Sequence, residues 1–339
     1  MKLDIVVPDY PPNIYGGTEI FTKDLADNLK NKLSVSVITT GINKDKHVTA
    51  LPKISKSRIL NNIFQICFFT FKLLKSKSDL IVAHMFASSG IAALIVAKIK
   101  KKPVILRLSG FEFRFKWPMM PIFLNMLRFY DGIICINSDM KKKILRYNKN
   151  IVVFPQGIKG PIMKIKKLNK KPNIIFVGRF VKFKNLKLFL ELCKKMPDYN
   201  FHLVGDGPDL NLLNSYSLSN LTYYGTLKKN KLFKLLKKMD ILVNTSYEEP
   251  FGRIFIEAMK FRVPVLARNK GGPKDIIISG RNGYLVKKYT LKEYSKKIKL
   301  ILKDYDKIQS KIQEEFIKYD WNFLLKKYIK FYKKIYLSK

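Results

Sequence analysis

Residues 241–267 read ILVNTSYEEPFGRIFIEAMKFRVPVLA and hold two short apolar runs, separated by a polar loop and an amphipathic segment. The runs ILVNT and VPVLA are rich in branched side chains, which is typical of buried strands. FIEAMKF, between them, has apolar residues at helical spacing. Pro250 predicts that this helix begins near it, because proline suits the first helical turn. A strand, a helix and a second strand in this order form a βαβ unit of a parallel sheet.

The same alternation extends along the whole chain of 339 residues. Further apolar runs bounded by turns are LDIVV, VSVIT, LIVAH, VILRL, GIICI and IVVFP in the first half, and NIIFVG, FHLVG, LTYYG and GYLV in the second. A polar, lysine-rich stretch with two prolines, residues 159–173, separates the two series. We therefore expect an α/β protein with two Rossmann-like, doubly wound parallel-sheet domains that face a central cleft.

The predicted domains are residues 1–160 and residues 161–318, followed by a helix at 319–339. Apolar residues recur in this tail at helical spacing, from Trp321 through Leu324 and Tyr328 to Phe331, while lysines cover the other face. A basic amphipathic helix of this kind can lie on a membrane. We favour the other interpretation, in which the tail packs back on the first domain.

Composition restricts the compartment and the partners. The cysteines Cys67, Cys135 and Cys193 are far apart in the sequence, which excludes a disulfide scaffold and favours a reducing, cytoplasmic setting. The net charge is +41, but 56 of the 66 cations are lysine and they are spread along the chain. Arginine is the residue favoured for phosphate and base contacts, so we do not expect nucleic-acid binding as the main activity.

Two stretches bear on membrane contact. Leu80–Ala97 is a stretch of 18 residues that contains no Lys, Arg, Asp or Glu. It divides, however, into the strand LIVAH and a helix after Gly90. Ile63–Leu74 is shorter and contains polar residues, so no transmembrane segment is predicted. Residues 111–129 mix aromatic, Met and basic side chains. This segment is either an ordinary helix and loop or a contact with the inner face of an anionic membrane.

Two glutamates flank the predicted helix start in the opening stretch. Glu249 and Glu257 are eight residues apart, which is about 12 Å along the axis if the whole span is helical. This exceeds the separation that glycoside hydrolysis needs and suits an elongated ligand held at two points. Backbone N–H groups around Phe251, Gly252 and Arg253 would form an anion site between them. The spacing predicts a nucleotide diphosphate sugar, with its sugar at Glu249 and its ribose at Glu257.

The order of motifs along the chain resembles glycosyltransferase family 4. EPFGRIFIE at 249–257 matches the family's Glu, seven residues, Glu signature, and VPV, Gly271–Gly272 and GRNGYLV follow in family order. FVGRFVKFKN matches the segment whose diphosphate-binding pair corresponds to Arg179 and Lys184. Other matching segments are HLVGDGP with Gly205, YGGTEIF with Gly16 and Gly17, LIVAH ending in His84, and the tail from Trp321.

The resemblance implies a GT-B fold and retaining sugar transfer without a protein nucleophile. It assigns Arg179 and Lys184 to the diphosphate, and Gly16 and Gly17 to the same phosphates from the other domain. Fixed cations and N–H dipoles would then stabilise the leaving nucleotide, so no metal is expected. The one Asp-x-Asp triplet, Asp304–Asp306, is interpreted as solvated surface.

Some positions depart from the family pattern. Ser109 and Gly110 stand where many members have a His near the donor sugar, which weakens acid–base help from that site. Arg262 replaces a usual Gly, Gln156 a usual Asn, and Asp275 a frequent Glu. His84 is retained, and it is either a site residue or a hydrogen-bonded structural group.

The sequence thus predicts transfer of a hexose from a UDP- or GDP-sugar to a glycan or lipid-linked acceptor, in cell-surface polysaccharide or glycoconjugate synthesis. An epimerase or phosphorylase on the same fold is one alternative. A non-enzymatic protein that binds polyanions is another, and it would bind nucleic acid with a steep salt dependence.

Overall fold

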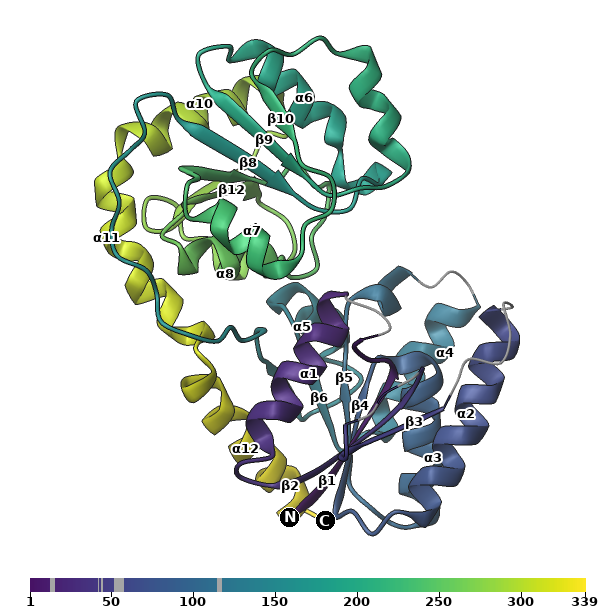
Figure 1. The fold of residues 1–339 in the computed structure, drawn as a ribbon. Coiled ribbons are helices and arrows are strands. Elements are labelled where there is room, and N and C mark those ends of the chain that lie inside the picture. Colours follow the sequence, from purple (N-terminus) through teal and green to yellow (C-terminus); the bar gives the residue numbers. More distant parts are fainter. Residues whose placement is uncertain (13–15, 42, 44, 52–57, 115–117) are drawn as a thin grey trace. The chain divides into compact units, whose positions relative to one another are not determined.

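The computed structural model describes residues 1–12, 16–41, 43, 45–51, 58–114 and 118–339. The chain forms two compact units. Unit 1 contains residues 1–157 and 321–339, and unit 2 contains residues 158–320. Figure 1 shows that each unit has its own sheet.

The sheet of unit 1 is parallel and has the order β3-β2-β1-β4-β5-β6-β7. Its strands are β1 (Lys2–Asp9), β2 (Ser34–Thr40), β3 (Val48–Leu51), β4 (Leu80–His84), β5 (Val104–Arg107), β6 (Gly132–Cys135) and β7 (Ile151–Val153). All were predicted except β3, a four-residue edge strand. The chain runs outward from β1 to β3 and then restarts beside β1 with β4. The strand order therefore reverses between β1 and β4.

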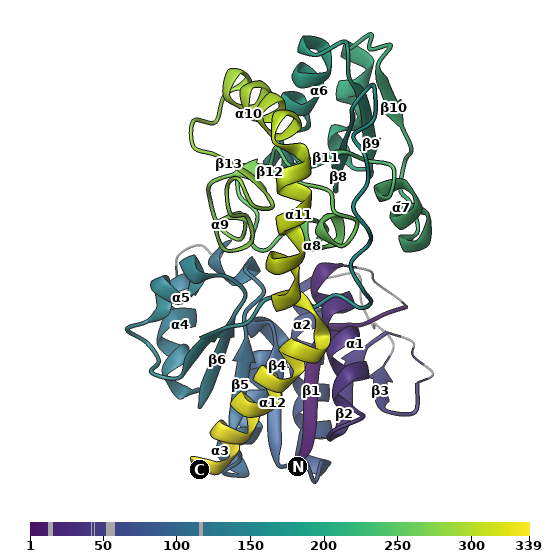
Figure 2. The ribbon, with the colours of Figure 1, turned by 90° about the vertical axis from the view of Figure 1, so that its left-hand side faces the viewer.

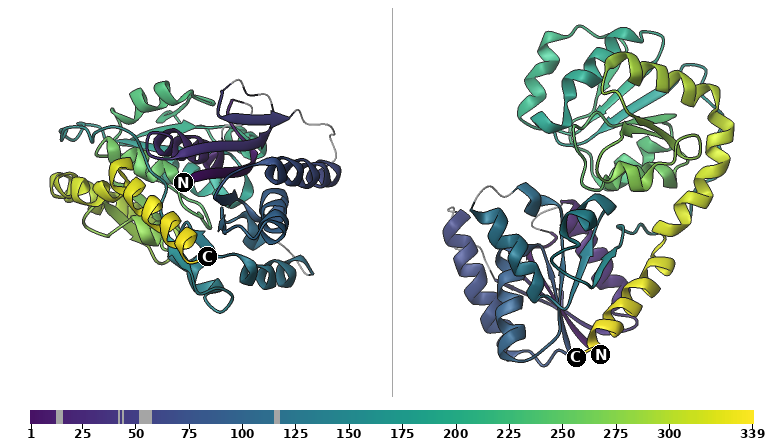
Figure 3. Two further views of the ribbon diagram at one scale, coloured as in Figure 1. Left: turned by 90° about the horizontal axis from the view of Figure 1, so that it is seen from below. Right: turned by 180° about the vertical axis from the view of Figure 1, so that it is seen from behind.

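Helices cover both faces of this sheet. They are α1 (Gly17–Leu29), α2 (Arg58–Lys75), α3 (Ile91–Ile99), α4 (Met119–Met126), α5 (Ser138–Ile144) and α12 (Trp321–Leu337), with short turns η1 (Phe86–Gly90), η2 (Phe111–Arg114) and η3 (Leu127–Phe129). Figures 2 and 3 show α1 and α12 on one face and α2 and α3 on the other. Leu80–Ala97 is thus a strand, a turn and a helix, as predicted. No helix among the described residues combines the length and hydropathy needed to cross a membrane.

The apolar face of α12 is part of the unit 1 core. Its aromatic and aliphatic side chains join a buried cluster with residues of α1 and the strands, and Trp321 stacks on Phe21 with ring centroids 5.7 Å apart. The approach is close at Gly132, where an added Cβ would lie 2.9 Å from the Phe331 ring. The tail therefore buries its apolar face in protein and leaves its lysines exposed.

The sheet of unit 2 is also parallel and has the order β10-β9-β8-β11-β12-β13. Its strands, all predicted, are β8 (Asn173–Val177), β9 (Asn200–Val204), β10 (Leu221–Tyr223), β11 (Ile241–Val243), β12 (Val265–Arg268) and β13 (Gly283–Val286). The chain runs outward from β8 to β10 and restarts beside β8 with β11. This reversal between β8 and β11 is the topological switch point of unit 2.

The helices of unit 2 are α6 (Leu186–Lys195), α7 (Lys229–Leu236), α8 (Arg253–Lys260), α9 (Pro273–Ile276), α10 (Leu291–Lys303) and α11 (Tyr305–Phe316), with turns η4 (Lys182–Lys184), η5 (Pro208–Ser215) and η6 (Ile317–Tyr319). A helix was predicted to begin near Pro250, and α8 begins shortly after it, at Arg253. Gly252, its N-cap, has φ +89°, so the preceding residues cannot continue a right-handed helix.

The interpretation of Asp304–Asp306 as solvated surface is wrong for part of the triplet. Tyr305 is buried, and its hydroxyl donates to Asp240 Oδ1 at 3.1 Å. Asp304 accepts a hydrogen bond of 3.1 Å from the Tyr284 hydroxyl. Asp306 alone is exposed, on the first turn of α11. The triplet joins α10 to α11 and fastens that junction to the sheet.

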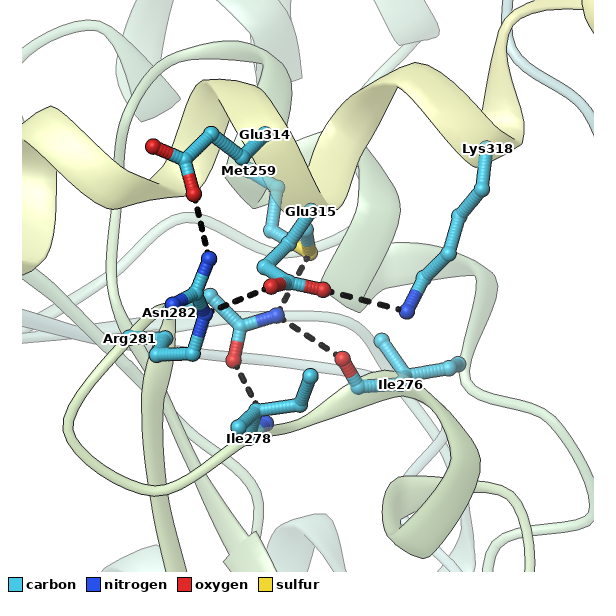
Figure 4. A network of polar contacts seen from close by, with 8 residues as sticks. All are labelled: Met259, Ile276, Ile278, Arg281, Asn282, Glu314, Glu315 and Lys318. Atoms are coloured by element: carbon cyan, nitrogen blue, oxygen red, sulfur yellow. Dashed lines mark hydrogen bonds and ion pairs between the residues drawn. The ribbon is translucent and has the colours of Figure 1, made fainter.

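A polar network holds α11 against the turn that precedes β13 (Figure 4). Arg281 pairs with Glu314 and, through Nε at 2.7 Å, with Glu315, which also accepts from Lys318. Asn282 is wholly buried and donates to the Ile276 carbonyl at 2.8 Å. These contacts fix α11, the helix that packs against α8.

Candidate active site

The predicted residues gather at the switch points of the two units. In open parallel sheets, ligands bind beyond the carboxyl ends of the strands where the strand order reverses. In unit 2, Arg179 and Lys184 follow β8, whereas Glu249 and Gly252 follow β11, its neighbour. In unit 1, Gly16 and Gly17 follow β1, and His84 ends the neighbouring β4. Each unit therefore presents its predicted set at the place where such sheets bind ligands.

Lys184 and Glu249 form an ion pair across the unit 2 switch point, a contact that sequence reasoning missed. Their side chains are 14% and 13% exposed, so the pair is largely shielded from water. Two hydrogen bonds to backbone carbonyls fix both loops: the Thr245 hydroxyl donates to the Lys184 carbonyl at 3.0 Å, and the Tyr247 N–H donates to the Phe183 carbonyl at 2.8 Å. The cation is therefore held where the carboxylate can reach it.

Arg179 lies on the turn that follows β8, and its side chain is exposed. The loop after β9 fixes this turn: the Gly178 N–H donates to Val204 O at 3.0 Å, and the Phe180 N–H donates to Asp206 O at 2.7 Å. Gly205 permits the approach, since it has φ +136° and an added Cβ would lie 1.8 Å from the Gly178 oxygen. Its structural role is thus to position the Arg179 turn, while donor binding by Gly205 remains a prediction.

The start of α8 is built from close glycine contacts. Phe251 is buried, and the Gly272 N–H donates to the Glu249 carbonyl at 2.8 Å. A Cβ added to Gly272 would lie 2.5 Å from the backbone of Phe251, so only glycine fits there. The first N–H groups of a helix lack intrahelical partners and carry its positive dipole end. The loop thus places Glu249 beside a helix start suited to an anion.

Arg253 and Glu257 form a second ion pair on the first turns of α8. Arg253 Nε lies 3.2 Å from Glu257 Oε1, and the side chains are 10% and 11% exposed. Separate donor-binding roles were predicted for the two residues, but their pairing was not. Their i, i+4 spacing was the available signal, because such side chains are neighbours on a helix. The pair fixes the Glu257 carboxylate one turn beyond the helix start.

In unit 1, α1 begins directly after Gly16, and Tyr15 lies outside the described residues. The Ile20 N–H donates to the Gly16 carbonyl at 3.0 Å, and an added Cβ at Gly17 would meet no atom within 4 Å. Glu19 was not predicted to matter, but its carboxylate lies against Gly16, where an added Cβ would be 2.2 Å from Oε2. Burial raises the pKa of Glu19. An acidic side chain thus covers this helix start in the structure.

His84 is wholly buried, and its Nδ1 lies 2.6 Å from the Thr22 hydroxyl oxygen. That hydroxyl already donates to the Thr18 carbonyl at 2.8 Å, so Nδ1 carries the ring proton and donates to Thr22. Burial, together with the nearby Arg107 cation, holds the pKa of His84 well below its ordinary value. His84 is therefore a neutral, hydrogen-bonded group with a buried Nε2 acceptor, and its catalytic role remains a prediction.

Glu112 fills the loop where Ser109 and Gly110 replace the family's usual His. It is 1% exposed and accepts hydrogen bonds from the backbone N–H groups of Ser109, at 3.1 and 3.2 Å, and Gly110, at 2.8 Å. The Phe86 N–H adds a contact of 3.3 Å. No motif in the sequence predicted a role for this carboxylate. It holds the ends of β4 and β5 together.

Arg262 stands where the family usually has glycine, and the structure gives the reason for that preference. Its backbone has φ +53°, a region that side chains rarely adopt. Its guanidinium offsets the strain by donating to Met163 O at 2.8 Å, Gln309 O at 2.6 Å and Gln313 Oε1 at 2.6 Å. The departure therefore fastens α11 and the start of unit 2 to the end of α8.

Two family models match consecutive parts of the chain: Glycosyltransferase Family 4 over residues 15–159, and Glycosyl transferases group 1 over residues 160–320. The sulfoquinovosyl transferase of Arabidopsis thaliana is 25% identical over 285 residues. The match covers 74% of this chain and 55% of that protein. The lipopolysaccharide 1,6-galactosyltransferase of Salmonella typhimurium is 27% identical over 58% of each chain.

Among solved structures, HepE from Anabaena in complex with UDP and glucose is similar, with a TM-score of 0.78 at 17% identity. The match covers 97% of this chain and 98% of that one. Both units have the parallel, doubly wound sheets of that fold class, and the two family models together extend from residue 15 to residue 320. The chain belongs to glycosyltransferase family 4 and has the GT-B fold.

Proposed function

We propose that the protein is a retaining, metal-independent hexosyltransferase that takes its sugar from a UDP- or GDP-sugar. The observation that carries the proposal is the unit 2 switch point, where Lys184, Glu249 and the start of α8 lie on loops bonded to one another. A diphosphate is the ligand class suited to a lysine beside a helix N-terminus. The solved structure of HepE with UDP and glucose supports this donor class.

The ion pair between Lys184 and Glu249 suggests how donor binding acts on the site. A phosphate arriving at the start of α8 would compete with the Glu249 carboxylate for the Lys184 ammonium. Release from Lys184 leaves Glu249 able to accept hydrogen bonds from sugar hydroxyls. Arg179, exposed on the neighbouring turn, would fork onto two phosphate oxygens. Binding would thus exchange an internal ion pair for two contacts to the donor.

In the proposed reaction, the bond between the anomeric carbon and the donor phosphate oxygen breaks, and a bond to the acceptor hydroxyl oxygen forms on the same face of the sugar. The acceptor proton passes to the leaving phosphate. Negative charge grows on the nucleoside diphosphate as the bond breaks, and the fixed cations and helix start stabilise this charge more in the transition state than in the ground state. Glu257, held by Arg253, would accept the ribose hydroxyls.

Arg179, Lys184 and the α8 start supply positive charge where a transferase of another type would place a divalent ion. For this reason the proposed reaction needs no metal. The cations remain in place through the reaction, so charge stabilisation costs little reorganisation.

We place the acceptor among glycans or lipid-linked glycans of cell-surface polysaccharide, and the enzyme in the cytoplasm at the inner face of the membrane. The similarity to a lipopolysaccharide 1,6-galactosyltransferase supports the glycan acceptor.

A thermal-shift panel of UDP-, GDP- and ADP-sugars tests the donor class, because a ligand that binds only the folded state raises the melting temperature. We expect UDP- or GDP-sugars to stabilise the wild-type chain and to lose most of this effect in Glu257→Gln. Equal shifts with nucleic acid, insensitive to Glu257→Gln, would instead favour a polyanion-binding protein. Conversion of the nucleotide sugar to an epimer without an acceptor would favour an epimerase, and activity on a free sugar phosphate would favour a phosphorylase.

A further inference from the structure

The outward faces of α2 and α3 in unit 1 are apolar, although they face solvent. We define the α2–α3 face as five residues of α2 and two of α3. They are Leu60, Ile63, Cys67, Phe71, Leu74, Ile95 and Ile99. Ile63 is 55% exposed, Phe71 50% and Ile99 63%. Figures 1 and 3 show α2 and α3 side by side on the sheet face opposite α12.

The arrangement of this face is regular. The α2 members recur at steps of three and four residues, so they form one stripe along a helix of 18 residues. Phe68, Phe69 and Leu73, on the other side of α2, are buried against unit 1. The helix is thus apolar on its buried side and again on its exposed side. A contiguous exposed apolar surface of this kind marks an interaction site rather than scattered surface residues.

The two helices that carry the stripe contain lysines but no acidic residues. Neither α2 nor α3 contains Asp or Glu, while Lys72, Lys75 and Lys98 lie on them. The Lys75 ammonium lies 4.2 Å from the centre of the Phe71 ring, and Lys98 Nζ lies 5.6 Å from that of Phe129. Long lysine side chains beside aromatic residues can keep their charges at a polar boundary while their stems and neighbours contact an apolar phase.

We propose that the α2–α3 face rests on an anionic phospholipid bilayer, with its apolar stripe at the acyl boundary and its lysines at the phosphate headgroups. The lysines and the apolar side chains of this face together determine which partner fits it. A second copy of the chain would place lysine beside lysine with no acid on either helix. Nucleic acid would satisfy the lysines but leave the apolar stripe in water. An anionic lipid surface matches both features.

This inference rests on the placement at the membrane under the proposed function and names the surface that makes the contact. It requires no donor, so its failure would leave the donor assignment intact. It also differs from the two membrane contacts considered from the sequence, residues 111–129 and the tail. Residues 115–117 lie outside the described part of the chain, and most apolar side chains of α12 pack in the core. The exposed face of α12 carries Lys326, Lys330 and Lys333 and supplies a control with fewer exposed apolar side chains. Those side chains are Phe323, Tyr336 and Leu337.

Cys67 permits a direct test on the full chain, because it is exposed within the stripe while Cys135 and Cys193 are buried. A polarity-sensitive fluorophore attached to Cys67 is mixed with vesicles of phosphatidylcholine alone, or of phosphatidylcholine with 30% phosphatidylglycerol. We expect a blue shift and quenching by lipid-borne quenchers with the anionic vesicles only. The same label at Lys333→Cys in a Cys67→Ser chain should not shift. No shift at Cys67, or equal shifts at both positions, would overturn the proposal.

Vesicle flotation of matched variants distinguishes binding through the α2–α3 face from binding through net positive charge alone. Ile63→Ser/Phe71→Ser should weaken binding at least tenfold. Lys72→Gln/Lys75→Gln/Lys98→Gln should weaken it by about fivefold per lysine, from roughly 1 kcal/mol for each cation near the surface. Lys326→Gln/Lys330→Gln/Lys333→Gln should weaken it less. Equal losses in both triple variants would overturn the proposal, as would a dimer in sedimentation that Ile63→Ser/Phe71→Ser dissociates. Retained donor-induced thermal shifts in each variant would show that the donor site is unaffected.

Discussion

Lys184 and Glu249, 65 residues apart in the sequence, form an ion pair that joins the turn after β8 to the loop after β11. These strands are neighbours at the point where the sheet order of unit 2 reverses. The pair therefore occupies the position where a parallel sheet presents its ligand, and it links the cation expected at the diphosphate to the carboxylate expected at the sugar.

Replacing Lys184 with Met should lower kcat/KM for sugar transfer by about ten- to a hundredfold. This range follows from the loss of one charge-assisted contact, worth about 1.5–3 kcal/mol. Steady-state kinetics with the donor identified by thermal shift measures it. Lys187→Met is the matched control, because Lys187 is an exposed lysine on the neighbouring helix α6. If both variants lose activity equally, or neither does, Lys184 has no specific role.

Gly205→Ala should destabilise unit 2 by about 2 kcal/mol or more. The residue has φ +136°, and the added Cβ would meet the Gly178 oxygen at 1.8 Å. Gly17→Ala, which meets no atom within 4 Å, should leave stability nearly unchanged. Calorimetry should give a melting temperature at least about 4 °C lower for Gly205→Ala. A transition at the wild-type temperature would mean that the β8 and β9 loops do not pack as described.

His84 should make unit 1 less stable as the pH falls. Its pKa is lowered in the folded state by burial and then by Arg107, so the unfolded chain binds the proton first. The contribution is present above the unfolded pKa of about 6.5 and is lost below it. Between pH 7.5 and pH 5.5 the free energy of unfolding should fall by on the order of 1 kcal/mol.

Urea unfolding followed by Trp321 fluorescence measures this loss, because Trp321 lies in the unit 1 core. A Trp117→Phe background removes the other tryptophan. The His84→Gln variant should have a lower free energy of unfolding at pH 7.5, but it should lack this part of the pH dependence. The same pH dependence in both chains would show that His84 titrates normally.

Thiol chemistry should distinguish Cys67 from the other two cysteines. Cys67 is exposed, whereas burial, followed by the charge of Glu112, raises the pKa of Cys135 to about 12. Burial also raises the pKa of Cys193. One thiol per chain should react with Ellman's reagent at pH 8 in buffer, and three in denaturant. Rapid reaction of more than one thiol in the native chain would contradict the packing of β6 or α6.

Sugar transfer should continue in excess EDTA at an unchanged rate, because the proposed site relies on fixed cations. The assay is run with chelator and then with added Mg²⁺ or Mn²⁺. A loss of activity that either metal restores would overturn metal independence while leaving the donor assignment intact.

Much of the fold could be predicted from apolar runs, because buried strands of parallel sheets are continuous and β-branched. β3 was missed because VTAL is four residues long and lies among polar residues at the sheet edge. The start of α8 was predicted near Pro250 but not to the residue, because the left-handed backbone of Gly252 delays the helix to Arg253.

The site could be predicted as a set of residues but not as a set of contacts. Arg253 and Glu257 are close in sequence, and their pairing was available from helical spacing. The pairing of Lys184 with Glu249 depends on which strands become neighbours, and the burial of Glu112 depends on loop packing. The strain at Arg262 is equally hidden, because its compensating partners come from distant segments.

A crystal structure of the chain with its nucleotide donor bound tests the central claim most directly. We predict the diphosphate at the first N–H groups of α8, with the Lys184 ammonium moved from Glu249 to a phosphate oxygen. A donor bound elsewhere in unit 2, with Lys184 and Glu249 still paired, would contradict the account.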